Sequence, residues 1–328
     1  MSRSDRDGLK IFSGRASMAL SEKICRYLDL PMGQGHTDMF PDGEILVKVE
    51  EDVRGRDCFI VQSTHHPVNA NLMELLIYID CLKRASASRI TAVMPYMGYA
   101  RQDRKDAGRV PITAKLVANL ITTAGADRVL ALDMHAEQIQ GFFDIPVDHL
   151  HAAPVIVKYL NSIRDQLGDL VLVSPDVGNV KMANNYANWI GGELAIIDKR
   201  RESGSQVVSN NIIGSVKDKT VVMVDDMIST AGTMCEAAKL CIKNGAKDII
   251  CAATHPVLVG LAMERLSESP ISKIVVTDSI PTGQRCSPIE SKLVELTVAE
   301  LLGEAIHRIH HNQSVSSLFR KDNGGAKR

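Results

Sequence analysis

Two adjacent aspartates, Asp225 and Asp226, directly follow an apolar run rich in β-branched residues at 221–224. Such a run predicts a buried strand. The residues at 229–233 are small and rich in hydroxyl groups, and good helix formers begin at Met234, which predicts a tight turn and then a helix. Backbone N–H groups and the positive end of a helix dipole would meet at this turn, which favours binding of a phosphate group.

The aspartate pair adds a second kind of chemistry to this stretch. Two carboxylates would repel a phosphate, but they accept hydrogen bonds from sugar hydroxyls or coordinate a metal ion. A phosphorylated sugar satisfies both halves of the pattern. The alternative interpretation is a helix cap in a solvated turn, which an Asp-Asp pair on its own favours about equally.

Two other stretches place polar residues just after predicted strands. Asp176 and Gly178 follow the apolar run 170–173, and a helix is predicted to start soon after them. This arrangement indicates a second anion or metal–phosphate site. His135 follows the apolar run 129–132, at the carboxyl end of a strand, where parallel sheets bind ligands. A single histidine in such a place is most often structural.

Charged residues gather in two further segments. Six charges lie between Arg101 and Arg109, and residues 198–201 read Asp-Lys-Arg-Arg ahead of a Gly/Ser-containing segment at 202–206 that we expect to be a flexible linker. Runs of this kind are usually solvated surface loops. The functional alternative is that arginine and lysine grip polyphosphate oxygens and stabilise a phosphoryl transition state.

A gapless internal match suggests how these segments are positioned. Residues 53–62 align with 216–225, and only the second copy carries the acid pair, because the first has Gln62 and Ser63 there. A helix and a strand follow each copy, at 72–83 and 89–94 in the first and at 234–243 and 248–253 in the second. The repeat predicts two related α/β halves with parallel strands joined by helices.

The pattern also predicts several elements outside the repeat. These are a strand over 45–49, a helix over 111–120, a strand over 193–197, a helix over 257–266, a strand over 274–277 and a last long helix over 293–311.

Composition limits the function classes. The chain has 328 residues, enough for two domains, with 45% hydrophobic residues, 4% aromatic residues and a net charge of −1. Neither a nucleic-acid surface nor a membrane span is expected from these values. The polar N-terminus lacks a signal-peptide core. Seven cysteines without a Cys-x-x-Cys pair indicate a reduced, cytoplasmic protein without a zinc site.

The motifs together resemble the ribose-phosphate diphosphokinases, or phosphoribosyl pyrophosphate synthetases, over residues 10–320. The resemblance is strongest in the 225–233 loop, in DMHAEQIQGFF at 133–143, in Arg101-Gln102-Asp103 and in residues 199–201. It implies an α/β fold of two duplicated phosphoribosyltransferase-type, Rossmann-like domains, whose parallel sheets are flanked by helices. The implied domains are 8–151, with the tail 311–320 packed on it, and 152–310, followed by a disordered tail at 321–328.

The resemblance also implies an activity and its residues. The β,γ-diphosphoryl group of ATP would move to the anomeric hydroxyl of ribose 5-phosphate, giving phosphoribosyl pyrophosphate and AMP for nucleotide biosynthesis, with Mg²⁺ as the cofactor. The implied residues are Lys199 and Arg201 for catalysis; Arg201, Asp225, Asp226, Ser229, Thr230, Ala231, Gly232 and Thr233 for ribose 5-phosphate; Phe40, Asp42, Gly43, Glu44, Arg101, Gln102 and Asp103 for ATP; His135 and Asp176 for the metal; and Arg54, Ser314 and Ser316 for allosteric control.

Family members form homo-oligomers, typically hexamers, in which the loop at 40–44 reaches the ATP of a neighbour. The resemblance points to the bacterial-type, phosphate-dependent class. This chain departs from the family at Ser229, at Asn179 and at Gly108, which stand for the usual aspartate, glycine and serine. The last of these departures predicts altered ADP inhibition. Two alternatives stay open: a phosphoribosyltransferase that consumes phosphoribosyl pyrophosphate, and a non-catalytic regulatory homologue that binds synthetase subunits.

Overall fold

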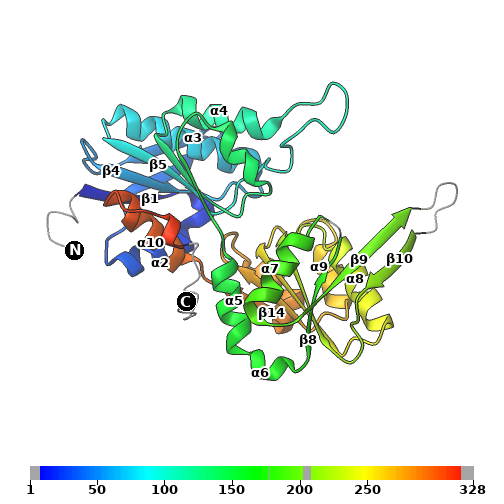
Figure 1. Ribbon diagram of the computed structural model, residues 1–328. Coiled ribbons are helices and arrows are strands. Elements are labelled where there is room, and N and C mark those ends of the chain that lie inside the picture. Colours follow the sequence, from blue (N-terminus) through cyan, green and yellow to red (C-terminus); the bar gives the residue numbers. More distant parts are fainter. Residues whose placement is uncertain (1–7, 177, 202–207, 319–328) are drawn as a thin grey trace. The chain divides into compact units, whose positions relative to one another are not determined.

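The chain is divided into two units in this computed structural model, which describes residues 8–176, 178–201 and 208–318 (Figure 1). The first unit comprises Met1–Ala152, Ser279–Pro281 and Thr297–Arg328, and the second comprises Ala153–Asp278 and Thr282–Leu296. The expected second domain, 152–310, therefore extends too far toward the C-terminus, because its last helix belongs to the first unit. The predicted linker at 202–206 and the predicted disordered tail at 321–328 lie outside the described residues.

A five-stranded parallel sheet forms the centre of the first unit, with the strand order β1-β4-β5-β6-β7. Its strands are β1 (Leu9–Ser13), β4 (Asp57–Val61), β5 (Arg89–Met94), β6 (Arg128–Leu132) and β7 (Val147–Leu150). Both faces of the sheet are covered, which is usual for parallel sheets and explains why these strands are apolar on both sides.

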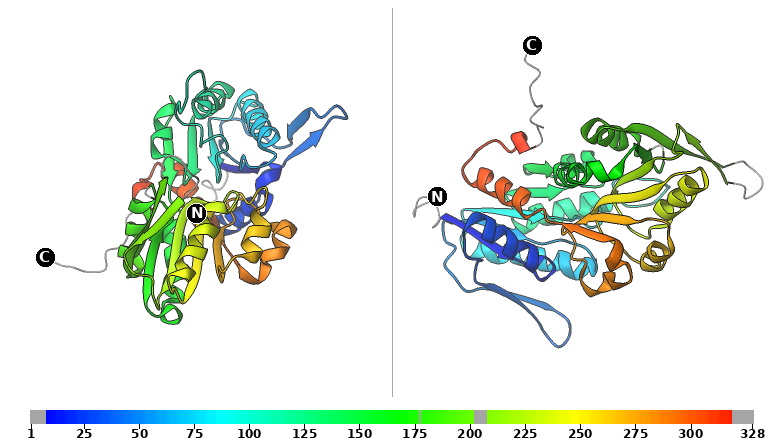
Figure 2. Two further views of the ribbon diagram at one scale, coloured as in Figure 1. Left: turned by 90° about the vertical axis from the view of Figure 1, so that its right-hand side faces the viewer. Right: turned by 90° about the horizontal axis from the view of Figure 1, so that it is seen from below.

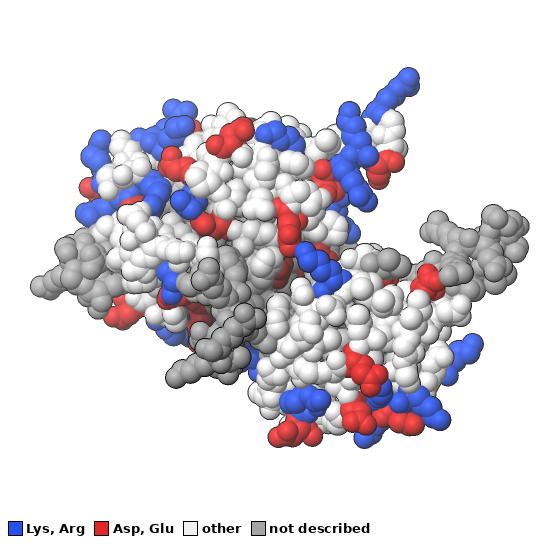
Figure 3. All heavy atoms as spheres, in the orientation of Figure 1, with Lys and Arg blue, Asp and Glu red and all other residues white. Residues whose placement is uncertain are grey.

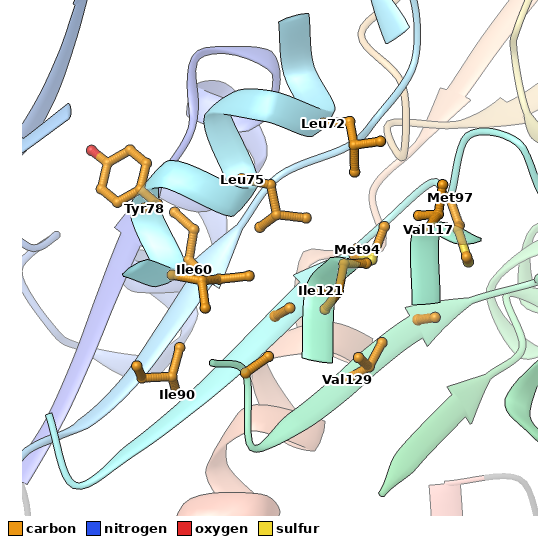
Figure 4. Close-up of a cluster of buried hydrophobic side chains, with 14 of the residues drawn as sticks. Ile60, Leu72, Leu75, Tyr78, Ile90, Met94, Met97, Val117, Ile121 and Val129 are labelled. Atoms are coloured by element: carbon orange, nitrogen blue, oxygen red, sulfur yellow. The ribbon is translucent and has the colours of Figure 1, made fainter. Parts of the chain in front are cut away.

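Helices α3 (Val68–Arg84) and α4 (Thr113–Ala124) cover one face of this sheet (Figure 4). Their buried side chains, among them Leu75 and Ile121, pack with alternate strand residues such as Ile60 and Val129. The other face lies toward α2 (Met18–Leu28) and α10 (Ala299–His310), which pack on each other. The remaining short helical turns of the unit are η1 (Arg15–Ser17), η2 (Glu137–Phe142) and η4 (Ser316–Leu318).

Two segments project from the body of the first unit. Strands β2 (Gly35–Met39) and β3 (Ile45–Val49) pair antiparallel as a separate hairpin (Figure 2). Its exposed large side chains are Met39, Phe40 and Leu46. The loop between β5 and α4 carries the exposed charges from Arg101 to Arg109, and Figure 3 shows it standing out at the upper right.

The second unit is built on a seven-stranded sheet with the order β10-β9-β8-β11-β12-β13-β14. All neighbours are parallel except β10 and β9. The strands are β8 (Leu170–Ser174), β9 (Glu193–Arg201), β10 (Val208–Ile213), β11 (Thr220–Met227), β12 (Asp248–His255), β13 (Lys273–Thr277) and β14 (Leu293–Leu296).

Strand residues of the second unit alternate between two buried clusters. Val221, Met223 and Cys251 pack with helices α8 (Gly232–Lys243) and α9 (Ala262–Glu268) and with η3 (Gly283–Lys292). Val222 and Val224 pack on the opposite face with α5 (Ala153–Ser162) and α7 (Val180–Ile190), near the short α6 (Arg164–Leu167). This alternation is the period of two that a strand imposes on its side chains.

The internal repeat matches equivalent pairings in the two sheets. Asp57 pairs with Arg89 in the first unit, and the aligned Thr220 pairs with Asp248 in the second. Three predicted elements were wrong in extent or type. The predicted helix 257–266 begins only at Ala262, residues 293–296 of the predicted last helix form strand β14, and β9 continues to Arg201 because it pairs with β10. No helix in the described part of the chain has the length and apolar character that a membrane crossing requires.

Candidate functional site

The predicted phosphate turn lies between β11 and α8 in the second unit. Its residues are Ser229, Thr230, Ala231, Gly232 and Thr233, of which the two threonines are exposed. The first N–H groups of a helix have no acceptor within the helix, so α8 offers donors and a positive dipole end at this turn. The predicted strand, turn and helix are therefore present in this order, and their geometry suits a phosphate group.

Backbone contacts hold the phosphate turn in shape from the opposite side. The N–H groups of Leu258 and Val259 donate to the carbonyls of Ile228 and Ser229, at 2.9 and 3.0 Å. Arg265 donates from its guanidinium to the carbonyl of Thr230 at 2.9 Å. Ala231 takes a left-handed conformation with φ of 59°, a strain that tends to persist where the surrounding structure fixes a functional loop.

The two acids at the end of β11 share a partly buried site. The Oδ1 atom of Asp225 accepts hydrogen bonds from the Asp226 backbone N–H at 2.8 Å and from the Asn179 side-chain amide at 2.9 Å. Burial, together with the hydrogen bond and charge of Asp226, raises the pKa of Asp225 to about 7, while the amide of Asn179 opposes this rise. A sugar hydroxyl that donates to this pair would favour the charged form.

The turn after β8 lies beside this acid pair, as the contact through Asn179 shows. Asp176 accepts the backbone N–H of Asn179 on its Oδ1 at 3.0 Å, and its carbonyl accepts the Ser174 hydroxyl at 2.6 Å. Asn179 has φ of −93°, so the turn does not require glycine at this position. Carboxylate oxygens are the ligands that Mg²⁺ prefers, and Asp176 and the acid pair offer such oxygens on neighbouring turns.

His135 lies exposed on the turn between β6 and η2 in the first unit. Asp133, two residues earlier, is left-handed with φ of 37°. It is held by His151, whose Nδ1 lies 2.9 Å from Oδ1, and by the N–H of Ala152, which donates to Oδ2 at 2.9 Å. His149 accepts the N–H of Met134 on Nε2 at 2.9 Å. The end of β7 therefore fixes the turn that carries His135.

Asp133, His149 and His151 have potential metal-ligating atoms within 4.8 Å of one another. The hydrogen bond to the Asp133 carboxylate raises the pKa of His151, although burial opposes this rise. Because the Nε2 lone pair of His149 already accepts the Met134 N–H, a hydrogen-bonded brace explains this cluster better than an ion does. These three residues were not predicted as site residues.

The position in the first unit that corresponds to the acid pair is filled by the protein itself. Gln62 donates to the buried carboxylate of Glu74 at 3.0 Å, and Glu74 also accepts from the backbone N–H and the guanidinium of Arg15. Ser63 donates to the carbonyl of Ser279 at 2.5 Å. The first copy of the repeat has therefore exchanged its ligand-binding groups for internal contacts.

The residues predicted for ATP lie in two segments of the first unit. Phe40, Asp42, Gly43 and Glu44 form the tip of the β2–β3 hairpin, where the Phe40 and Glu44 backbones pair and Asp42 accepts the Glu44 N–H at 3.2 Å. In the charged loop, Gln102 accepts the Thr113 hydroxyl at 2.5 Å. Asp103 accepts the Gln138 amide at 2.9 Å, which links the segment 101–103 to the segment that carries His135.

The remaining predicted residues lie elsewhere. Lys199 and Arg201 lie in β9, where their backbones pair with Asn210 and Val208 of β10. The loop that the sequence predicts at these residues is therefore a strand. Ser314 and Ser316 line a pocket of about 530 Å³ in the first unit. Arg54 does not line this pocket; its guanidinium donates to Ser86 at 3.2 Å. The other residues that line the pocket are Arg128, Gln140, Val147, Asp148, His149, Ile309, Asn312, Gln313 and Val315.

Sequence reasoning missed two supports of the site. The side chain of Asn179 was considered only for its backbone freedom, although its amide reaches Asp225. Arg265 lies more than thirty residues after the turn it holds, in α9. The sequence shows an asparagine just before a predicted helix, but it does not show that the side chain contacts Asp225, 46 residues later.

Comparison with known proteins finds relatives that match nearly the whole chain. Residues 9–125 match the family model described as the N-terminal domain of ribose phosphate pyrophosphokinase, and residues 205–320 match the phosphoribosyl synthetase-associated domain. The chain is 61% identical over 315 residues to the ribose-phosphate pyrophosphokinase of Rhodopirellula baltica, covering 95% of this chain and 99% of that one. It is 50% identical over 312 residues to that of Helicobacter pylori, covering 95% and 96%.

A solved structure agrees with these sequence matches. The crystal structure of phosphoribosylpyrophosphate synthetase from Mycobacterium smegmatis is similar with a TM-score of 0.87 and 43% identity, over 93% of this chain and 99% of that one. The predicted fold class, an α/β chain with two phosphoribosyltransferase-type units on parallel sheets, is thereby confirmed.

Proposed function

Because the chain belongs to the ribose-phosphate pyrophosphokinases, which make phosphoribosyl pyrophosphate from ATP and ribose 5-phosphate, we propose a role for each part of its site in that reaction. The observation that carries the proposal is the acid pair at the end of β11, followed directly by a strained turn and the start of α8. This is the combination that a phosphorylated sugar requires.

Ribose 5-phosphate binds in the second unit. The 5-phosphate accepts hydrogen bonds from the backbone N–H groups and hydroxyls of Ser229–Thr233, and Asp225 and Asp226 accept hydrogen bonds from the ribose hydroxyls. Ser229 stands where the family usually has aspartate, and its hydroxyl and N–H can both donate to phosphate. Fixing the sugar at both ends orients its anomeric hydroxyl, and orientation of this kind supplies much of the rate in phosphoryl transfer.

ATP binds through residues of the first unit. The ring of Phe40 stacks on adenine, with Asp42, Gly43 and Glu44 beside it, and Arg101, Gln102 and Asp103 complete the site. Asp176 and His135 would hold Mg²⁺, which when bound neutralises charge on the phosphate oxygens. The carboxylate of Asp176 is an oxygen ligand of the kind that Mg²⁺ prefers, and the hydrogen bonds that hold Asp133 support a fixed position for the His135 turn.

The transfer itself needs few chemical groups from the protein. The anomeric hydroxyl loses its proton to solvent as its oxygen forms a bond to the β-phosphorus, the bond between that phosphorus and the oxygen bridging to the α-phosphorus breaks, and AMP leaves. Lys199 and Arg201 stabilise the charge that develops on the transferred group. Arg201 also contacts ribose 5-phosphate.

Assembly and regulation follow the family in this proposal. The chain forms a homo-oligomer, a hexamer in the simplest case, and the hairpin tip at 40–44 serves the ATP of a neighbouring subunit. It belongs to the bacterial-type, phosphate-dependent class, with Arg54, Ser314 and Ser316 at the regulatory site. The pocket lined by Ser314 and Ser316 supports the assignment of these two serines. Gly108 in place of serine alters inhibition by ADP, and an ADP titration with ordinary strong allosteric inhibition would contradict that point.

Release of AMP from ATP tests the proposal directly. With Mg²⁺ and ribose 5-phosphate, we expect stoichiometric AMP and phosphoribosyl pyrophosphate, and no AMP when ribose 5-phosphate is left out. Lys199→Ala should lower kcat by about a hundredfold or more, whereas Lys243→Ala, at the exposed end of α8, should not change it. Unchanged kcat in Lys199→Ala would remove this lysine from the mechanism.

A further inference from the structure

Asn179 is the N-cap residue of α7, and its carbonyl accepts the Ala183 N–H at 3.0 Å. Asparagine is a preferred residue at this place because its side chain usually accepts an N–H group of the first helical turn. Here the side chain makes no such cap bond. Its amide points instead to strand β11 and donates to Oδ1 of Asp225 at 2.9 Å. The helix therefore forgoes a contact that generally stabilises it by about 1 kcal/mol.

The bond to Asp225 fixes one specific oxygen of the acid pair. Oδ1 accepts both the Asn179 amide and the Asp226 backbone N–H, the latter at 2.8 Å. The amide comes from the turn after β8 and the N–H group from β11 itself, so the carboxylate plane cannot rotate without losing one of them. The other carboxylate oxygen is thereby given a defined direction.

The backbone of Asn179 is tied to the neighbouring turn at the same time. Its N–H donates to Oδ1 of Asp176 at 3.0 Å. One residue thus joins the turn after β8 to the acid pair after β11. These two strands are adjacent and parallel in the sheet, so both turns emerge at the same edge.

The backbone conformation leaves the choice of side chain free. With φ of −93°, the position accepts any L-residue without strain, so neither glycine nor asparagine is needed for the turn itself. Only a side chain of this length with an N–H donor makes the contact to Asp225. A carboxylate of the same shape would repel the acid pair.

We propose that Asn179 is a positioning residue for ribose 5-phosphate, which holds the carboxylate of Asp225 in the orientation that receives the ribose hydroxyls. This inference rests on the proposed role of Asp225 in binding the sugar.

Steady-state kinetics on the full-length enzyme distinguish positioning from a general structural role. A hydrogen bond to a charged group changes an equilibrium by roughly tenfold or more. Asn179→Ala and Asn179→Gly should therefore each raise KM for ribose 5-phosphate about tenfold and change KM for MgATP less than twofold. Asn184→Ala, at an exposed position of the same helix, should change neither constant. Asn179→Asp should be worse than Asn179→Ala, since it adds charge without a donor.

Two results would overturn the proposal. Unchanged KM for ribose 5-phosphate in both Asn179→Ala and Asn179→Gly, each with a normal melting temperature, would show that the contact has no functional effect. An equal rise in both KM values would show that Asn179 merely maintains the turn. Should Asn179→Ala fail to fold, Asn179→Gly, which keeps the same backbone range, decides between these outcomes.

A double-mutant cycle with Asp225→Asn separates this inference from the site on which it rests. If Asn179 acts only through Asp225, adding Asn179→Ala to Asp225→Asn should cause no further loss in kcat/KM for ribose 5-phosphate. Additive losses would contradict the positioning role alone. Unchanged KM for ribose 5-phosphate in Asp225→Asn would instead remove Asp225 from the sugar site, and the inference would fall with it.

Discussion

Asp225 must satisfy two opposing demands in one side chain. It needs to be charged in order to accept a ribose hydroxyl, but burial beside Asp226 raises its pKa to about 7. In the unfolded chain an aspartate titrates near 4. The folded state therefore binds a proton more tightly than the unfolded state, and the stability that this provides below about pH 4 is lost as the pH rises through about 7. The buried acid that the sugar site needs therefore makes the fold less stable at neutral pH.

Removing the charge of Asp225 should therefore make the fold more stable at neutral pH. Asp225→Asn keeps the shape of the protonated acid, so we expect it to melt roughly 5 °C higher than wild type at pH 8 and to melt alike near pH 4. Its KM for ribose 5-phosphate should rise, because an amide cannot replace both accepting oxygens. Melting temperatures followed across this pH range measure the effect.

An exposed aspartate provides the control. Asp218→Asn changes an exposed side chain on a turn ahead of β11. Its melting temperature should differ from that of wild type by the same small amount at every pH. A melting temperature of Asp225→Asn below that of wild type at pH 8 would contradict the assigned balance of forces.

Among the elements, α10 shows how a late segment is tied to an early strand. His310 contacts the Asp57 carboxylate of β4 through Nδ1 at 2.7 Å. Arg89 of β5 joins the same carboxylate and donates to the carbonyl of Ile309 at 3.0 Å. Although burial opposes it, the hydrogen bonds from His310 and Arg89 lower the pKa of Asp57. Two turns earlier on α10, Gly303 lets the ring of Tyr27 approach where a Cβ atom would lie 2.6 Å from it.

Removing the charge of Asp57 should loosen this helix. We expect Asp57→Asn to lower the free energy of unfolding by about 2 kcal/mol at pH 7, or the melting temperature by roughly 5 °C. A lowered pKa stabilises the fold above about pH 4, and this contribution is lost as the pH falls through the folded pKa. The difference from wild type should therefore narrow as the pH falls below about 4.

Asp80→Asn is the matched control, because its ion pair with Arg84 lies exposed on α3. Exposed pairs of this spacing contribute at most about 0.5 kcal/mol. If the two variants melt alike, the buried contact to His310 and Arg89 does not hold α10 in place.

The sequence was most informative where local pattern and tertiary role agree. The β-branched runs, the small-residue turn and the helix formers near Met234 were enough to place the phosphate turn between β11 and α8. Residues 293–296 were misassigned because Leu293, Val294 and Leu296 fit a helical stripe, whereas pairing with β13 decides their conformation. The contact of Asn179 with Asp225 depends on strand order, which no local pattern contains.

At the scale of the whole molecule, the hairpin tip tests the proposed assembly. Met39, Phe40 and Leu46 are 60%, 48% and 43% exposed on it. If the tip serves a neighbour, one complete site takes Phe40 from one subunit and Lys199 from another. Phe40→Ala and Lys199→Ala should each have low activity, and co-refolding equal amounts of both should restore about a quarter of wild-type activity, the share of sites that receive both intact residues.

The concentration of ATP must be kept below the raised KM of Phe40→Ala in this assay. Each variant refolded alone is the control for slow recovery of activity. Activity that stays at the mean of the two variants after mixing would mean that each hairpin serves its own subunit, and light scattering on the same samples reports whether oligomers formed.

The first unit is not continuous along the chain, since it contains Ser279–Pro281 and the segment from Thr297 onward as well as its N-terminal part. A ribosome makes a chain from its N-terminus, and domains commonly fold in that order as they emerge. In this chain the second unit has its complete sequence once Leu296 is out, whereas α10 of the first unit is still to come. The first unit is therefore begun first but completed last. During translation, the face of α2 that packs on α10 stays uncovered until α10 has been made.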